Sequence, residues 1–239
     1  MLKEFAQYLV SLRENKTYEI HGNTYSDNRL EYIEPHIDRP IRTEVSGLDS
    51  IVTLIKHEST KFALTLPLFV QLKSEREVYV FSSLDDQMER NWLYRATCDM
   101  RSFEEGYRDA ERAIVELRSK YIPNEGTEYL LGLLSRINIE NGVTTQDNGV
   151  SQSVEARTGI SLKTMENIKP RVKLMPYRTF LEVEQPESEF LLRLSKDGDV
   201  GIFEADGGMW KLEAKKRIKD YLTKALEPMI NSGEVAVMM

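Results

Sequence analysis

The chain has 239 residues, of which 41% are apolar and 30% charged, so it can bury a core as one large or two small domains, and disorder is excluded over most of its length. Its formal net charge of −7 disfavours general DNA binding, which depends on Lys and Arg displacing counterions from phosphates. It has no run of about 18 apolar residues and no signal-peptide pattern, so we expect a cytoplasmic protein with no membrane partner. Its single cysteine cannot form an internal disulfide, which also fits the cytoplasm.

The first expected element is an amphipathic helix over Met1 to Glu14. Its apolar side chains recur along one helical face, and they are Leu2, Phe5, Tyr8, Leu9 and Leu12. This face predicts a helix that docks on the chain or is swapped with another copy. A polar, turn-rich stretch over residues 18–23 follows, and a strand is expected from Leu30 to Ile33, ended by Pro35.

Residues 46–97 predict a helix followed by a small β-meander. Ser46 or Asp49 can cap a helix that ends near Phe62. Three short runs rich in β-branched and aromatic residues then indicate strands, the first two joined by a charged hairpin connection. The runs are Leu68 to Leu72, Val78 to Phe81 and Trp92 to Thr97.

Two further helices are expected after the meander. Apolar residues recur at helical spacing from Tyr107 to Tyr121, and Pro123 marks the stop. The segment Glu125 to Ile137 carries a second apolar stripe that includes Leu130 and Leu133. The short connection between the two segments predicts that they pack as a helical hairpin.

The second half of the sequence alternates as β-strands do. Asn148-Gly149 supplies the positive φ angles of a tight turn, which predicts a hairpin of residues 143–146 with 150–157. Further strands are expected at Val172 to Met175, Phe180 to Glu184, Phe190 to Leu194 and Val200 to Glu204. A final amphipathic helix spans Met209 to Leu226, and the apolar tail Val235 to Met239 is either frayed or a strand awaiting a partner.

These elements predict an α+β fold. We expect helices and a small meander in residues 1–138, and a mainly antiparallel β unit closed by the C-terminal amphipathic helix in residues 139–239. Exposed apolar ends and free strand edges also predict a closed homo-oligomer, because such edges otherwise pair without control.

Three stretches of the second half carry a resemblance to a family. They are Val143 to Gln152 (VTTQDNGVSQ), Pro176 to Pro186 (PYRTFLEVEQP) and Phe203 to Ala214 (FEADGGMWKLEA). In these residues the chain resembles the YfdQ-type prophage proteins, and the likeness continues more weakly through the helices around Tyr107 to Asn138. The resemblance implies a phage or prophage protein of a bacterial host with an early, non-virion role, and it carries no catalytic residues to transfer.

The candidate catalytic groups are better explained as structural residues. Asp199 with Glu213 and Lys215 matches the pattern of a metal-dependent nuclease, but that chemistry places the Glu-x-Lys on a strand and here it falls in a helix. Glu182 and Glu184 share one face of an expected strand, as solvated carboxylates do. We therefore expect a protein that is not an enzyme and that has no cofactor and no metal site.

The strongest candidate for a ligand site is a glycine turn at the start of the last helix. Asp206, Gly207 and Gly208 lead into the helix, and the backbone N–H groups exposed at such a turn bind anions. Cationic side chains of the same half could join them, namely Arg157, Arg178, Lys211 and Lys215. The alternative is that Asp206 caps the helix and that the arginines form structural ion pairs.

We therefore expect a non-enzymatic, homo-oligomeric phage or prophage accessory protein. It would bind a host protein or a small phosphate-bearing ligand in the bacterial cytoplasm, in host takeover or counter-defence. The alternative is an accessory protein of phage DNA recombination or replication, and a metal-dependent nuclease is the weaker alternative.

Overall fold

The structure is a computed structural model, and its contacts divide the chain into residues 1–39 and residues 40–239. The described residues are 2–11, 16–21, 23–26, 40–59, 66–85, 88–101, 103–138, 144–147, 152–158, 162–195 and 199–239. The strand predicted from Leu30 to Ile33 lies outside them. No helix in these ranges is both long enough and apolar enough to cross a membrane.

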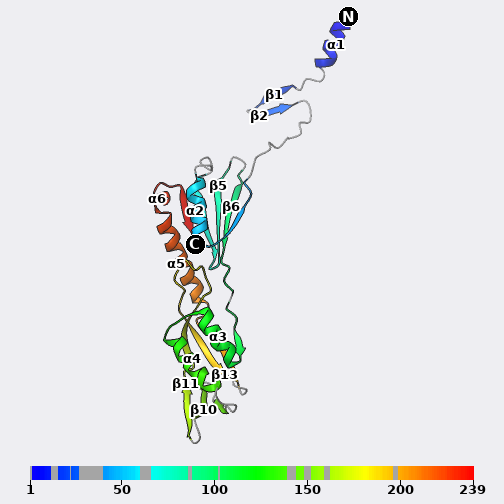
Figure 1. Ribbon diagram of the computed structural model, residues 1–239. Coiled ribbons are helices and arrows are strands. Elements are labelled where there is room, and N and C mark those ends of the chain that lie inside the picture. Colours follow the sequence, from blue (N-terminus) through cyan, green and yellow to red (C-terminus); the bar gives the residue numbers. More distant parts are fainter. Residues whose placement is uncertain are drawn as a thin grey trace. The chain divides into compact units, whose positions relative to one another are not determined.

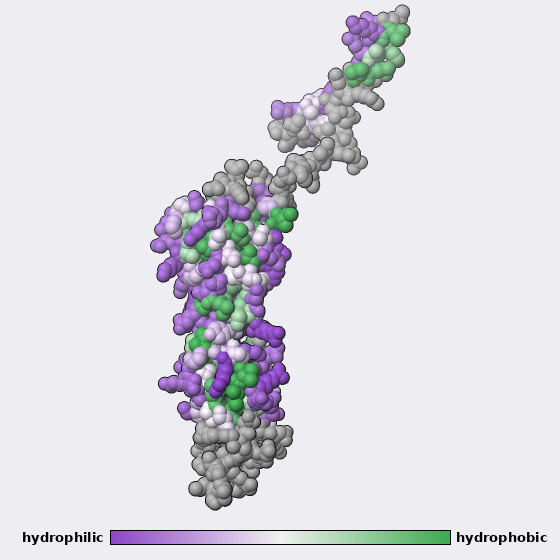
Figure 2. Space-filling view, in the orientation of Figure 1, coloured by the Kyte–Doolittle hydropathy of each residue, from purple (hydrophilic) through white to green (hydrophobic). Residues whose placement is uncertain are grey.

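The first unit contains a helix and a hairpin. Helix α1 (Leu2–Ser11) confirms the predicted N-terminal helix, and its apolar side chains lie at the surface, where Leu2 is 88% and Leu9 49% exposed (Figure 2). The turn-rich stretch belongs to a region predicted as short strands and loops, and it contributes to two short antiparallel strands, β1 (Thr17–Ile20) and β2 (Asn23–Ser26).

In the second unit, the first sheet has the strand order β15-β4-β5-β6-β3. Its strands β5 and β6 are labelled in Figure 1. Its strands are β3 (Thr43–Ser46), β4 (Leu68–Ser74), β5 (Glu77–Leu84), β6 (Arg90–Thr97) and β15 (Val235–Met238). The antiparallel succession β4-β5-β6 confirms the predicted meander. The C-terminal tail is a strand whose partner lies within the chain, because β15 pairs in parallel with β4, and β3 pairs in parallel with β6 at the other edge.

Helices α2 (Leu48–Glu58) and α5 (Met209–Ala225) cover one face of this sheet, and the short α6 (Glu227–Asn231) follows α5. Alternate strand residues point at the helices, since successive side chains of a strand face opposite ways. We call the resulting cluster the α2/α5 core, which includes Ile51, Ile55, Val70, Val80, Ile218 and Leu222. The predicted apolar stripe of the last helix is therefore a packing surface.

The second sheet is antiparallel and has the strand order β7-β14-β13-β12-β8. Its strands are β7 (Gly106–Arg108), β8 (Tyr121–Ile122), β12 (Arg171–Pro176), β13 (Ser188–Leu194) and β14 (Val200–Glu204). Helices α3 (Ala110–Lys120) and α4 (Glu125–Asn138) pack together as the predicted hairpin. Their buried side chains form the α3/α4 core with the sheet, including Leu117, Leu130, Leu134, Leu174, Phe190 and Leu192.

A third, antiparallel sheet has the order β11-β10-β9, with β9 (Thr144–Asp147), β10 (Gln152–Thr158) and β11 (Leu162–Ile168). Asp147 pairs with Gln152, which confirms the predicted hairpin, although its connecting residues 148–151 lie outside the described ones. Strand β11 was not predicted from the sequence. The molecule is therefore α+β, as predicted.

Two expectations about the second half are corrected by this arrangement. The C-terminal helix packs mainly on β4 and β15 of the first sheet, so the cores do not follow a division after residue 138. The segment 180–184 is a turn and not a strand. The buried Gln185 side chain holds this segment: its Oε1 accepts from the Arg178 and Thr179 N–H groups at 3.0 and 3.1 Å, and its Nε2 donates to the Phe180 carbonyl at 2.9 Å.

The turn also determines how α2 begins. The N-cap residue is Gly47, at φ 88°, and neither Ser46 nor Asp49 caps the helix through its side chain. Instead Glu182 Oε1 accepts from the N–H groups of Leu48 at 2.5 Å and Asp49 at 3.3 Å. A carboxylate at a helix N-terminus satisfies free donors and interacts favourably with the helix dipole.

We expect Glu182→Ala to lower the free energy of unfolding by about 1 kcal/mol, the usual value of a helix cap. Glu184→Ala is the matched control in the same turn. Glu184 is mostly exposed and pairs with Arg217, so its removal should cost less than about 0.5 kcal/mol. Urea unfolding of the two variants measures the difference, and equal losses would contradict a capping role for Glu182.

Candidate functional site

The glycine turn before α5 is filled by a side chain of its own. Asp206 Oδ1 accepts from the Gly208 N–H at 2.9 Å, and Oδ2 accepts from the Trp210 N–H at 3.1 Å. Gly207 and Gly208 have φ angles of 63° and 81°, which glycine adopts without strain. The Asp206 carboxylate thus accepts from the backbone N–H groups that were expected to bind an anion. This agrees with the alternative in which Asp206 caps the helix.

Arg178 is buried, with 1% of its side chain exposed, and is held by its neighbours. Its Nη1 donates to Glu204 Oε1 at 2.8 Å, its Nη2 donates to Ser188 Oγ, and its guanidinium lies 3.9 Å from the Trp210 ring centroid. Burial lowers the pKa of Arg178 to about 10, and the charge of Glu204 only partly offsets this. The group is a structural ion pair and not a free anion receptor.

Of the predicted site residues, the structure brings Arg178, Asp206 and Lys211 together around Trp210. The Lys211 ammonium lies 5.8 Å from the Trp210 ring centroid, while Lys215 is half-buried one turn further along α5. Arg157 lies in β10, where its backbone pairs with Lys163, and its side chain is outside the described part. Glu213, the candidate nuclease carboxylate, accepts from Arg217 at 3.1 Å. Within the described ranges no group of His, Cys, Asp and Glu could hold a metal ion.

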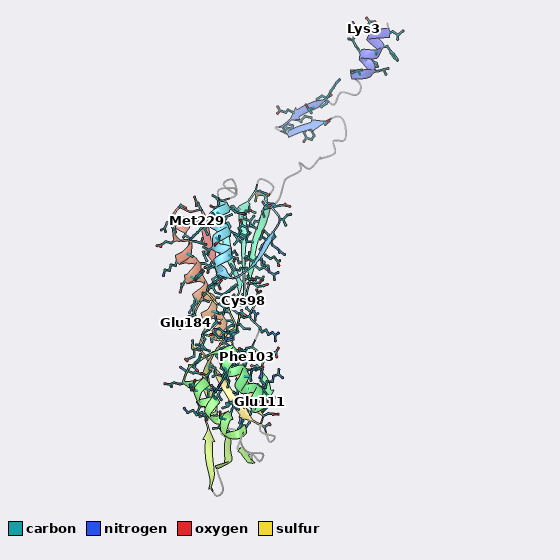
Figure 3. All side chains as sticks on the ribbon, viewed as in Figure 1. Lys3, Cys98, Phe103, Glu111, Glu184 and Met229 are labelled. Atoms are coloured by element: carbon teal, nitrogen blue, oxygen red, sulfur yellow. The ribbon has the colours of Figure 1, made fainter. Side chains whose placement is uncertain are left out.

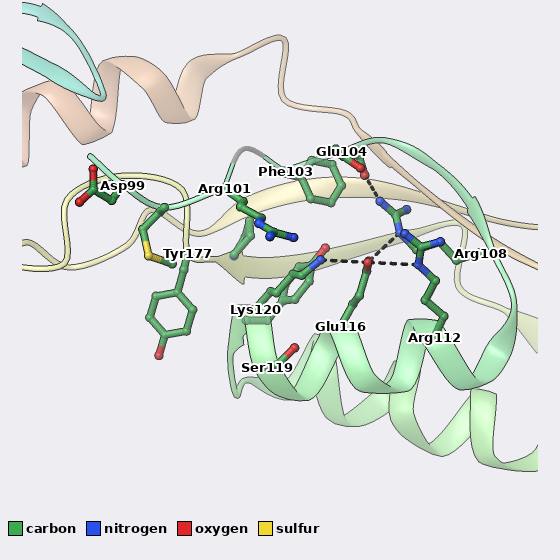
Figure 4. A pocket seen from close by; sticks show the side chains of 13 residues that line it. Asp99, Arg101, Phe103, Glu104, Arg108, Arg112, Glu116, Ser119, Lys120 and Tyr177 are labelled. Carbon is green, nitrogen blue, oxygen red and sulfur yellow. Dashed lines mark hydrogen bonds and ion pairs between the residues drawn. The ribbon is translucent and has the colours of Figure 1, made fainter. Parts of the chain in front are cut away.

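A cationic cleft of about 380 Å³ lies between α3 and residues 99–101 and 103–104 (Figure 4). Its cationic lining residues are Arg101, Arg108, Arg112 and Lys120, and its aromatic ones are Phe103, Tyr121 and Tyr177. Phe103 packs on the α3/α4 core (Figure 3) and makes an edge contact with Phe190, with 5.1 Å between the ring centroids. The cleft therefore has an aromatic wall beside charged side chains.

Glu116 lies at the centre of the charged side chains. It pairs with Arg108 at 2.6 Å, Lys120 at 2.9 Å and Arg112 at 3.6 Å. Burial by itself would raise the pKa of Glu116, but the hydrogen bond from Lys120 and the charges of the two arginines outweigh it and lower the pKa. The carboxylate is therefore ionised at neutral pH and holds the cations as a bound anion would.

Three of the cations remain accessible to a ligand. Arg112 is 65% and Lys120 51% exposed, and Arg101 is exposed and has no hydrogen-bond or ion-pair partner among the described residues. Figure 4 shows the Arg101 guanidinium directed toward Lys120 and Glu116. Asp99 and Glu104 also line the cleft, so four cations stand against three carboxylates.

This cleft was not predicted from the sequence, although part of it is visible there. Arg108, Arg112, Glu116 and Lys120 follow one another at intervals of four residues, which places the last three on one face of α3. The approach of Arg101 from the segment before β7 depends on the fold and has no local signal.

Comparison of the chain with protein-family models, with curated proteins and with solved structures gives no match. The resemblance to the YfdQ-type prophage proteins therefore stays a prediction.

We expect Arg178→Met to lower the free energy of unfolding by about 3 kcal/mol, because it leaves the Glu204 carboxylate without its buried partner. Arg171→Met is the matched control, since Arg171 is 62% exposed and pairs with Glu189 on the same sheet. That exposed pair should contribute less than about 1 kcal/mol. Urea denaturation of both variants tests the contrast. Similar losses would show that the Arg178 pair is no stronger than a surface pair.

Proposed function

We propose that the protein is a non-enzymatic phage or prophage accessory protein that binds a small phosphate-bearing ligand in the cleft beside α3. One observation carries the proposal: several cationic side chains converge on a single carboxylate in a cleft with an aromatic wall. Arginine and lysine donors recognise phosphate through charge-assisted hydrogen bonds, and aromatic rings bind the organic part of a ligand.

The size and charge of the cleft favour a small ligand. Its volume of about 380 Å³ is near the lower end of ordinary small-molecule sites. Glu116 already neutralises part of the positive charge, so a phosphate has to compete with it for Arg112 and Lys120. Arg101 offers donors that no described residue engages. The ligand would therefore bind with modest affinity unless its organic part contacts Phe103, Tyr121 or Tyr177.

Isothermal titration with inorganic phosphate and with a purine nucleoside monophosphate tests this site. Arg101→Ala should weaken binding about tenfold or more, since a hydrogen bond to a charged group contributes about 1.5 to 3 kcal/mol. Glu116→Gln should tighten binding, because it removes the competing carboxylate. Lys211→Ala is the control at the glycine turn and should leave the affinity unchanged.

The outcomes separate the cleft from the glycine turn. Loss of binding in Lys211→Ala but not in Arg101→Ala would transfer the site to the turn. Weaker binding in Glu116→Gln, with the fold retained by circular dichroism, would contradict the competition between Glu116 and the ligand. Absence of binding at millimolar phosphate and nucleotide would overturn the proposal.

The phage origin and the homo-oligomeric state belong to the same proposal. The origin is supported by the three stretches that resemble the prophage proteins. Self-association is supported by α1, whose apolar face is exposed in the single chain. A ten-residue helix is marginal in water by itself and needs a surface to pack on.

Replacing Leu2, Phe5 and Leu9 by Ser should reduce the mass measured by light scattering, because a second copy of α1 would lose its packing surface. Lys3→Ser, on the same helix, is the matched control and should leave the mass unchanged. A parent protein that is already monomeric at micromolar concentration would contradict this assembly.

A further inference from the structure

We propose that the open face of the first sheet is a platform for single-stranded nucleic acid. This face is opposite to the one that α2 and α5 cover. Within the described part of residues 40–239, the helices that pack on this sheet contribute to the α2/α5 core on the other face. The proposal does not depend on the cleft beside α3, because none of the residues is shared.

Four aromatic rings from three neighbouring strands meet on the open face. Phe69 of β4 stacks on Phe81 of β5 with 5.6 Å between centroids, and Phe81 contacts Trp92 of β6 at 5.2 Å. Tyr79 meets the edge of Trp92 at 5.5 Å. These residues alternate with core residues such as Val80, so they point away from the helices.

Trp92 is the ring most accessible to a ligand. Its side chain is 48% exposed although it contacts two other rings, whereas most of the aromatic residues beneath it are half-buried or buried. A large aromatic ring left half in water has no role in the α2/α5 core, and base stacking is an interaction that such a ring can make.

Arginines accompany the rings. Arg90 lies 4.9 Å from the Phe69 centroid and 5.4 Å from the Phe81 centroid, and Arg95 lies 5.7 Å from the Tyr79 centroid. Guanidinium groups stacked on rings are held in position and still present N–H donors at their edges. Arg90 Nη1 donates to the Ser82 carbonyl at 3.0 Å, and the terminal donors of Arg95 are taken by Glu44 and Glu77. Phosphates of a strand whose bases stack on the rings would therefore meet the remaining donors of Arg90.

A groove of about 260 Å³ crosses the same face and joins the rings to further cations. It is lined by Arg42, Gln71, Lys73, Tyr79 and Trp92. Lys73 is exposed and has no ion-pair partner in the described part of the chain, while Arg42 pairs with Glu44 at 3.1 Å. The groove therefore combines stacking surfaces with charge, which is the combination that single-stranded nucleic acid requires.

The local charge contrasts with that of the whole chain. Arg42, Lys73, Arg90 and Arg95 stand against Glu44 and Glu77, which pair with Arg95. The resulting excess is small and cannot hold a duplex through its backbone alone, because duplex binding depends on many phosphate contacts. A single strand exposes its bases to the rings as well, so stacking adds to the few phosphate contacts.

Fluorescence anisotropy with labelled oligo-dT and oligo-U strands of about 20 nucleotides, at low salt, tests the platform. Trp92→Ala should weaken binding about ten- to hundredfold, and Trp92→Phe should restore most of it because the ring is kept. Lys73→Glu should weaken binding and reduce its salt dependence. Tyr107→Ala, at an exposed aromatic residue of β7 in the second sheet, is the matched control.

Preference for the DNA or the RNA strand identifies the source of the ligand, and either preference supports the platform. Binding that survives Trp92→Ala unchanged, or a mixed-sequence duplex bound more tightly than either single strand, would overturn it. So would the absence of saturable binding to both strands. Circular dichroism of Trp92→Ala checks that the fold is retained, and Trp92→Phe decides the role of the ring if it is not.

Discussion

The buried side chain of Gln185 is the constraint on which the second unit depends. Its amide hydrogen-bonds to the backbone of Arg178, Thr179 and Phe180 inside a turn that exposes little of it to water. A buried amide left unpaired would cost about 1 to 3 kcal/mol, so these hydrogen bonds stabilise this conformation of the turn. The same turn places Phe180 and Val183 in the α2/α5 core and directs Arg178 toward the second sheet.

Helices and strands were predictable from the sequence where burial of one face alone determines the spacing of apolar residues. The β4-β5-β6 meander, the α3 and α4 hairpin and the last helix bury every second or every third to fourth residue, which the sequence displays directly. Partners distant in sequence were not predictable: β15 joins β4 across more than half of the chain, and no local pattern encodes that pairing. The segment 180–184 was wrongly predicted as a strand because its apolar residues alternate with polar ones. In the structure it is a turn that buries Phe180 and Val183, and the Gln185 side chain, not a neighbouring strand, hydrogen-bonds to its backbone.

The candidate site shows the same limit. The turn Asp206-Gly207-Gly208 has the chemistry of an anion receptor, but residue types do not reveal whether the chain supplies the anion itself, and here Asp206 does. Arg178 was predicted as a ligand contact, with a structural ion pair as the alternative. In the structure it pairs with Glu204 and lies against Trp210, an arrangement that depends on the packing of α5. The spacing of the charged residues from Arg108 to Lys120 is visible in the sequence, but a charged helix face usually indicates only that this face is exposed to solvent.

The negative net charge of the chain does not exclude anion binding, because charges farther apart than about 10 Å are largely screened at physiological salt. What counts is the local set of groups, and both cationic surfaces contain their own carboxylates, Glu116 beside α3 and Glu44 with Glu77 on the open sheet face. Each carboxylate keeps the neighbouring cations ordered, which lowers the entropy lost on binding, but it also competes with an incoming phosphate. A ligand that offers charge alone gains little from either surface. The ligands proposed for the two surfaces carry a ring as well as a phosphate, since the aromatic walls would contribute an attraction with which the neighbouring carboxylates do not compete.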